Sequence, residues 1–158
     1  MQLNKETKEK LKAFVAGKMT WAEVEGMTAA EACGIAQTAC ELASEGKLEQ
    51  ARVLLEGLVA SNPLDAAARS ALGTVFQKLG RIEEAMAEYD GALTMDPRNV
   101  VALANRGELK LRRNDESGYQ DLVSAVQLDA TGKTAAGKRA QSLLKAIALA
   151  AVRQSAQA

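Results

Sequence analysis

The sequence predicts an all-α protein built from repeated helical hairpins, and two observations carry this prediction. The first is composition: 47% of the 158 residues are apolar but only 3% are aromatic, and alanine supplies much of the apolar total. Alanine is the best helix former, whereas aromatic residues favour strands. The second is internal repetition at a spacing of 34 residues. The residues that recur at this spacing are Gly46 and Gly80, Ala51 and Ala85, Pro63 and Pro97, and Gly73 and Gly107.

Each recurring residue type suits one position of a helical hairpin. Gly46 and Gly80 follow helical runs, so we expect them to end a first helix in the left-handed conformation. Gly73 and Gly107 lack a Cβ atom and let a first helix approach its second helix closely. The two prolines are the only ones in the chain. Because the residue before a proline is pushed out of the helical region, we expect each proline to follow the end of a second helix.

A repeat of about 34 residues that forms two antiparallel helices is the tetratricopeptide repeat (TPR). The sequence therefore predicts a right-handed superhelix of three TPR hairpins with an N-terminal helix and a C-terminal capping helix. The third hairpin is irregular, because Ala125 and Asp129 match Ala92 and Asp96 at a spacing of 33. The expected helices of the three hairpins are 28–45, 47–60, 65–79, 82–95, 99–113 and 116–128.

The expected domain organisation has three parts. Residues 1–27 form an N-terminal helical extension, residues 28–133 form the repeats (about 28–65, 66–99 and 100–133), and residues 134–158 form the capping helix and a frayed tail. The capping helix is expected near 134–152, and its apolar residues can cover the open end of the last hairpin. These covering residues are Leu143, Leu144, Ile147 and Val152.

The N-terminal extension has two interpretations. Apolar residues stand at helical spacing in a charged helix, and Thr20 to Glu23 form a capping-box pattern that opens a second short helix. A further capping box is expected at Thr28. The apolar residues either fold back on the first repeat as its cap or form a self-association surface. The residues of such a surface are Leu11, Phe14, Val15 and Trp21.

The order of these features resembles the class II chaperones of bacterial type III secretion systems, which escort translocator proteins. The resemblance rests on Phe14, Gly17 and Thr20 ahead of the first repeat, and on the segments GKLEQARVLLEGLVASNPLD and LGTVFQKLGRIEEAMAEYDGALTMDP. It implies a cytoplasmic, all-helical chaperone, often dimeric through its N-terminal helices, that holds an extended client segment in its concave groove. The chain departs from the family in having few aromatic residues on its first helices.

TPR first helices line the inner surface with their second, fifth, ninth and twelfth positions, and most of these residues are small here. Such a surface suits an extended or helical peptide whose side chains fill the gaps, with Gln37, Gln77, Asn105 and Glu108 as hydrogen-bonding partners for its backbone. Alternatively, the small residues only set the curvature of the repeats. The predicted groove consists of Cys33, Ala36, Gln37, Cys40, Ala67, Ser70, Thr74, Gln77, Val101, Ala104, Asn105, Glu108 and Leu111.

Several functional classes are disfavoured. Lys plus Arg and Asp plus Glu both number 20, so there is no global positive field for nucleic acid. No apolar segment is long enough to span a membrane, and we expect a soluble cytoplasmic protein. The sequence contains no histidine, which disfavours catalysis and metal binding. We expect no cofactor and interpret Cys33 and Cys40 as small packing residues that form no disulfide.

Two hypotheses about function remain. The first is a chaperone that holds an extended segment of a secreted or translocator client in the concave groove and that can form a homodimer. The second is a structural adaptor that tethers folded proteins in another bacterial complex through the convex face or the N-terminal helix. The two differ in which surface carries the partner, so a bulky substitution in the groove separates them.

Overall fold

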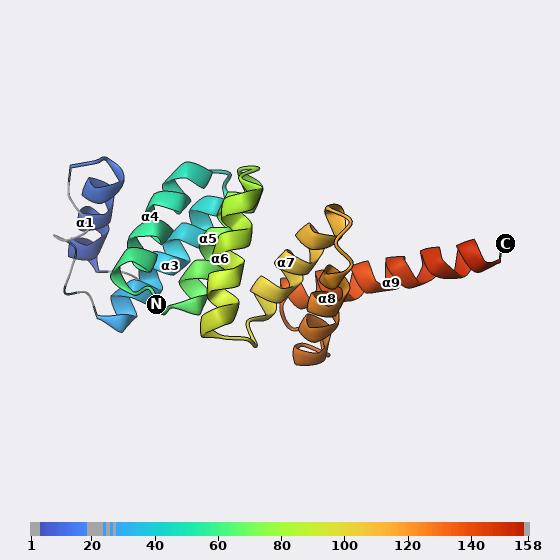
Figure 1. Ribbon diagram of the computed structural model, residues 1–158. Coiled ribbons are helices and arrows are strands. Elements are labelled where there is room, and N and C mark those ends of the chain that lie inside the picture. The colour runs from blue at the N-terminus through green and yellow to red at the C-terminus, as the bar shows by residue number, and fades with distance from the viewer. Residues whose placement is uncertain (1–3, 19–23, 25, 27, 157–158) are drawn as a thin grey trace. The chain divides into compact units, whose positions relative to one another are not determined.

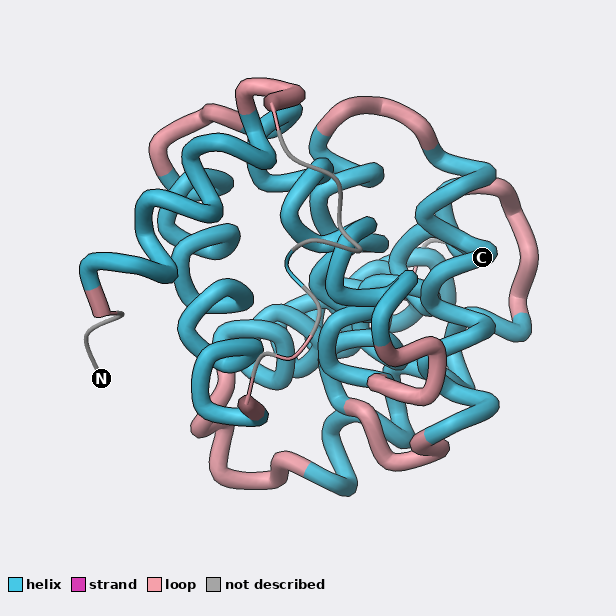
Figure 2. Tube along the Cα trace, turned by 90° about the vertical axis from the view of Figure 1, so that its left-hand side faces the viewer, coloured by secondary structure: helices cyan, strands magenta, loops and turns pink. Residues whose placement is uncertain are grey.

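The protein is described by a computed structural model that covers residues 4–18, 24, 26 and 28–156. All regular secondary structure among these residues is helical, and short loops join the helices (Figures 1 and 2). The helices are α1 (Lys5–Val15), α3 (Ala29–Ser44), α4 (Leu48–Ser61), α5 (Ala66–Lys78), α6 (Ile82–Met95), α7 (Val100–Arg112), α8 (Ser117–Leu128) and α9 (Ala135–Ser155). The expected all-α class is confirmed. The capping box predicted from Thr20 to Glu23 falls outside the described residues.

The expected helix boundaries are confirmed to within one residue, apart from the last helix, which runs to Ser155 into the tail that we expected to fray. Local signals explain this agreement. Thr28 forms the predicted capping box, in which its side chain accepts from the backbone N–H of Glu31 and the Glu31 carboxylate accepts from the backbone N–H of Thr28. Gly46 and Gly80 have φ values of 81° and 77°, as the left-handed helix ends require.

The chain divides into two compact units, residues 1–88 and 89–158, and the superhelical arrangement of the hairpins stays a prediction. In the first unit, α3 packs against α4, and α4 packs against α5 and α1. The buried apolar residues of these helices include Ile35, Leu54, Leu55 and Leu72. Helix α1 is also tied to α3, because the Thr7 hydroxyl donates a hydrogen bond of 3.1 Å to the Glu31 carboxylate.

In the second unit, α7 and α8 form a hairpin with a very close approach. A Cβ atom on Gly107 would lie 2.8 Å from the carbonyl oxygen of Gly118, and a Cβ atom on Gly118 would collide with the carbonyl oxygen of Gly107. The expected close approach at Gly107 is therefore confirmed, and its partner on the second helix is another glycine. We had not singled out Gly118 in the sequence.

Helix α9 covers the α7–α8 hairpin as expected, but with earlier residues. Its buried residues are Ala136, Gly137 and Ala140, which join a core that includes Leu103, Ala104, Leu122 and Ala125. Leu143 and Leu144 are half-buried at the edge of this core. The prediction that Ile147 and Val152 also cover the hairpin is wrong, because their exposed fractions are 38% and 65%.

The turn between α8 and α9 is organised by one carboxylate. Asp129 accepts hydrogen bonds from the backbone N–H groups of Lys133 and Thr134, both at 2.8 Å, and from the Thr134 hydroxyl at 2.7 Å. Gly137 sits so close that a Cβ atom there would lie 2.8 Å from Cγ of Asp129. The hydrogen bonds from Thr134 and Lys133 lower the pKa of the Asp129 carboxyl, because they favour its charged form.

We expect Asp129→Asn to reduce the loss of stability on acidification. A carboxyl whose pKa is lower in the folded than in the unfolded state stabilises the fold when the pH is above its pKa in the unfolded state, about 3.9. This stabilisation is lost as the pH falls through the pKa in the folded state. Thermal unfolding followed by circular dichroism between about pH 7 and about pH 3 measures the effect. The wild type should lose more stability than the variant over this range. Parallel pH profiles would show that Asp129 does not stabilise the turn through its charge.

Candidate peptide-binding surface

The first unit presents neighbouring faces of α3 and α5, which contact each other. Four of the predicted groove residues here are exposed and three are half-buried. We call these seven residues the α3–α5 surface: Cys33, Ala36, Gln37, Cys40, Ala67, Thr74 and Gln77. The eighth predicted residue, Ser70, is only 4% exposed and therefore does not belong to this surface.

Hydrogen bonds within the helices engage much of the polarity of the α3–α5 surface. The Thr74 hydroxyl donates to the carbonyl of Ser70 at 2.9 Å, one helical turn earlier. The side-chain amide of Gln37 donates to the carboxylate of Glu41 at 3.3 Å. The remaining side chains are mostly small, so a ligand can approach the two helices closely. Such a surface is suited to receiving the side chains of a ligand.

The two cysteines lie on this surface rather than in the core. Cys33 and Cys40 are both exposed and unpaired, so the expectation that they act as packing residues is wrong. Partial desolvation raises the pKa of the Cys40 thiol, which favours its protonated form at neutral pH. A protonated thiol is a poor nucleophile and is small and weakly polar.

In the second unit, α9 occupies much of the predicted groove face of α7. Ala104 is 1% exposed and belongs to the core shared with α9, and Asn105 is 2% exposed. Arg139 of α9 donates to the side-chain oxygen of Asn105 and pairs with Glu108 at 3.1 Å. The structure therefore corrects the prediction that Ala104 and Asn105 face a ligand. Val101 and Leu111 are half-buried.

The far end of α7 lines a separate cleft of about 640 Å³ in the second unit, between α7, α8 and α9. We call it the C-terminal cleft. Its apolar wall includes Leu111, which we had assigned to the groove, and Glu108 also lines it. The residues of the C-terminal cleft are Glu108, Leu111, Arg112, Glu116, Tyr119, Leu143 and Ile147. The apolar residues of the last helix were the sequence signal for this cleft, but we had assigned all of them to packing on the last hairpin.

The N-terminal residues form another cleft, of about 630 Å³, in the first unit. Leu11 lines it but is only 5% exposed, which is a correction to its assignment as a self-association residue. Phe14 and Val15 are half-buried, and Trp21 lies outside the described residues. Leu11 thus fits the alternative that α1 caps the first repeat. The cleft is lined by Lys8, Leu11, Lys12, Val15, Ala16, Thr38, Glu41, Leu42, Gln50 and Leu54.

Comparison with known proteins agrees with this architecture. The tetratricopeptide repeat family model matches residues 42–103, from the end of α3 to the start of α7. The chain has the tetratricopeptide repeat fold. No curated protein sequence matches the chain significantly. Among the described residues of this TPR protein, no helix has the length and apolarity to cross a membrane.

Solved structures resemble the TPR protein over most of its length. The type III secretion translocator chaperone SycD of Yersinia enterocolitica has a TM-score of 0.68 and 21% identity, and the match covers 81% of this chain and 90% of SycD. PcrH, solved in complex with the chaperone binding region of PopD, has a TM-score of 0.67 and 24% identity. This match covers 78% of the present chain and 96% of PcrH. Pseudomonas aeruginosa PilF has a TM-score of 0.61 and 30% identity, and the match covers 69% of the present chain and 48% of PilF.

The extent of the SycD match is informative. Its 81% of 158 residues amounts to about 128 residues, which exceeds the span of the three hairpins, residues 29–128. The similarity therefore extends to residues outside the repeats. The match to PilF covers less of this chain, 69%, and only 48% of PilF.

Proposed function

We propose that this TPR protein is a cytoplasmic chaperone that holds an extended segment of a secreted or translocator client on its α3–α5 surface. The observation that carries the proposal is the match to SycD and PcrH, which covers 90% and 96% of those chaperones. PcrH was solved with the chaperone binding region of PopD, and SycD with a peptide of the translocator YopD. Both of these chaperones thus bind a segment of another protein.

The chemistry of the α3–α5 surface fits an extended peptide. Its exposed and half-buried residues are small or of medium size and include no charged side chain. A peptide can therefore approach the two helices closely and place its own apolar side chains in the gaps between them. Binding then arises mainly from the burial of apolar area, at about 25 cal/mol per Å² before the cost of ordering the peptide. A client that keeps such a segment unfolded until secretion would satisfy these requirements.

The proposal assigns no catalytic step to the chain. The sequence lacks histidine, the commonest general base in enzymes. The Cys40 thiol has a raised pKa, which is opposite to the shift that activates a cysteine nucleophile. Partner binding is the function that these residues support.

A structural adaptor is the second candidate function. An adaptor would use the outer helices, and its binding would not depend on the α3–α5 surface.

We expect Ala36→Arg and Ala67→Arg each to abolish client capture. The long charged side chain would fill the gaps of the α3–α5 surface and would have to be desolvated beneath a bound peptide. The matched control is Ala87→Arg, the same change at an exposed position of α6. Tagged proteins are used as baits in lysate of the source organism, retained proteins are identified by mass spectrometry, and circular dichroism confirms that all variants are folded.

The outcomes separate the two candidates. Recovery of one hydrophobic, secretion-type protein by the wild type and by Ala87→Arg, but not by the other two variants, supports the chaperone. Equal recovery of folded complex components by the wild type, Ala36→Arg and Ala67→Arg contradicts the chaperone and supports the adaptor.

A further inference from the structure

The C-terminal half of α9 extends beyond the hairpin that its first half covers (Figure 1). The residues packed on α7 and α8 end at Leu144, and every described residue from Lys145 to Ala156 is exposed. We call residues 145–155 the overhang. At about 1.5 Å per residue it is a helix roughly 16 Å long. It is the continuation of a helix face that already packs on the α7–α8 hairpin.

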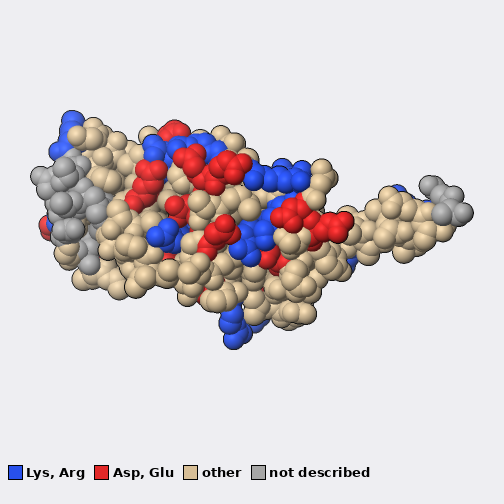
Figure 3. All heavy atoms as spheres, viewed as in Figure 1, with Lys and Arg blue, Asp and Glu red and all other residues tan. Residues whose placement is uncertain are grey.

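The middle of the overhang, residues 146–152, is apolar on all sides. Its residues 146–152 read AIALAAV, and Ile147, Leu149 and Val152 are 38%, 61% and 65% exposed. With about 3.6 residues per turn, Leu149 and Val152 point to a different side of the helix from Ile147. A helix that is apolar all round is typically buried against other elements. The view in Figure 3 agrees, since this end of the chain shows few charged atoms.

The C-terminal cleft lies at the base of the overhang and is itself apolar. Ile147 belongs to both features, and Tyr119 of α8, which also lines the cleft, is 50% exposed. One unit thus carries a projecting apolar helix and an open apolar cleft side by side. Such a pair is self-complementary, because a two-fold axis can place the projection of each copy in the cleft of the other.

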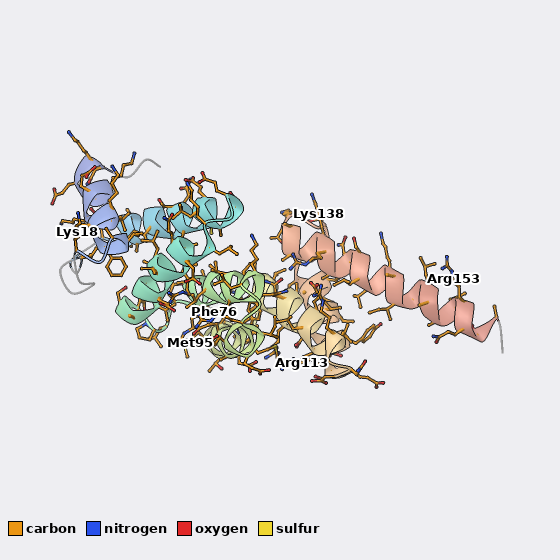
Figure 4. All side chains as sticks on the ribbon, turned by 90° about the horizontal axis from the view of Figure 1, so that it is seen from above. Lys18, Phe76, Met95, Arg113, Lys138 and Arg153 are labelled. Atoms are coloured by element: carbon orange, nitrogen blue, oxygen red, sulfur yellow. The ribbon has the colours of Figure 1, made fainter. Side chains whose placement is uncertain are left out.

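The charges are complementary as well. The overhang carries Lys145 and Arg153 and no acidic residue, and Arg153 lies near its C-terminal end (Figure 4). Glu116 lies in the C-terminal cleft. Among the residues that the structure describes, none of these three side chains is in an ion pair. A cationic overhang and a cleft with an unpaired carboxylate attract each other across an interface.

The available area favours a reciprocal contact. A helix roughly 16 Å long and about 10 Å across has about 500 Å² of surface, of which one partner can cover about half. That is well below the roughly 800 Å² that each partner buries in a typical stable interface. In a two-fold dimer each copy buries both its overhang and its cleft, which brings the total to about 1,000 Å², near the lower limit for a specific interface.

We infer that a second copy of this chain covers the overhang: two molecules form a two-fold dimer in which the overhang of each occupies the C-terminal cleft of the other. The contact is distinct from the N-terminal self-association surface and does not depend on the proposed chaperone function. Because the buried area is small, the dimer is expected to depend on concentration.

The first test is sedimentation velocity of the full chain between about 1 and about 100 μM, a range in which an interface of this size can assemble. The wild type should shift towards dimer as the concentration rises. The double variant Leu149→Glu/Val152→Glu removes apolar area and adds charges that repel Glu116, so its dissociation constant should rise about tenfold or more. The control Ser142→Glu places a charge on the exposed side of the packed half of α9 and should dimerise as the wild type does. Unchanged dimerisation of the double variant would overturn the inference.

The second test locates the contact by cross-linking. In a Cys33→Ser/Cys40→Ser background, chains with Val152→Cys are mixed with chains with Tyr119→Cys and oxidised. The mixed pair should cross-link at least about tenfold more than a control mixture of Val152→Cys with Lys138→Cys, which lies on the exposed side of α9. Equal cross-linking in both mixtures would overturn the inference. So would a chain that stays monomeric and cross-links through Val152→Cys only to a co-expressed client.

Discussion

Gly107→Ala is expected to lower the free energy of unfolding of the second unit by about 2–3 kcal/mol. The added Cβ atom would lie 2.8 Å from the carbonyl oxygen of Gly118, 3.0 Å from Cβ of Asp121 and 3.1 Å from Cγ of Leu122. Two of these neighbours are backbone or near-backbone atoms, so they can move only if α7 and α8 separate. Separation would in turn loosen the core between the two helices.

The direction of this effect is informative because helix propensity alone predicts the opposite sign. Alanine is better than glycine in a helix by about 1 kcal/mol. Gln120→Ala, at an exposed position of α8, is a control for an alanine substitution in the same hairpin without the close contact and should change stability by less than about 0.5 kcal/mol. Urea unfolding followed by circular dichroism gives both values. Stabilisation by Gly107→Ala would mean that α7 and α8 are not in close contact at this point.

Asp121→Asn is expected to cost about 2–3 kcal/mol, because it removes the anion that Arg106 and Lys110 share. Arg106 donates two hydrogen bonds of 2.8 Å to the Asp121 carboxylate, and Lys110 pairs with it at 3.0 Å. The side chains of all three residues are mostly buried, with exposed fractions of 10% for Asp121 and 19% for each cation. The asparagine would leave two cations desolvated with only Asp90 beside Arg106.

The pH dependence of the same group provides a second readout. Burial raises the pKa of Asp121, but hydrogen bonds from Arg106 and Lys110 outweigh burial and hold the pKa below its ordinary value. The contribution of Asp121 to folding stability is therefore complete when the pH is above the pKa of this carboxyl in the unfolded state. It is lost as the pH falls through the pKa in the folded state.

The matched control for this variant is Glu116→Gln. Glu116 is an exposed carboxylate in the same unit and is in no ion pair among the described residues. The control should change stability by less than about 0.5 kcal/mol at neutral pH. Equal effects of Asp121→Asn and Glu116→Gln in urea unfolding would contradict a stabilising role for the cluster.

The sequence was sufficient to predict the helices, because their ends are set by local chemistry. Gly46, Gly80 and the capping box at Thr28 act within a few residues of the chain, so they can be recognised without knowledge of the packing. The pairing of Gly107 with Gly118 was only half predicted. The 33-residue spacing of the third hairpin places Gly118 at the position of Ala85, and this offset is the signal that could have identified it.

The candidate site was harder to predict, because it depends on contacts between distant segments. The repeat pattern alone cannot show that Arg139 of α9 reaches Asn105 and Glu108, so we assigned both of the latter to a ligand. Nor does periodicity show where the cover of the hairpin ends. The apolar pattern of α9 continues beyond Leu144, but the contacts of α9 with the core of α7 and α8 end there. The α3–α5 surface as a binding site stays a prediction.

The most direct test of the chaperone proposal is a titration of the client segment, once the client has been identified, as a fluorescently labelled peptide. Fluorescence anisotropy gives its dissociation constant for the wild type, Ala67→Arg and Ala87→Arg. If the α3–α5 surface holds the segment, Ala67→Arg should weaken binding by about 100-fold or more, while Ala87→Arg binds as the wild type does. Equal affinities for all three proteins would contradict the proposal and place the client elsewhere on the chain.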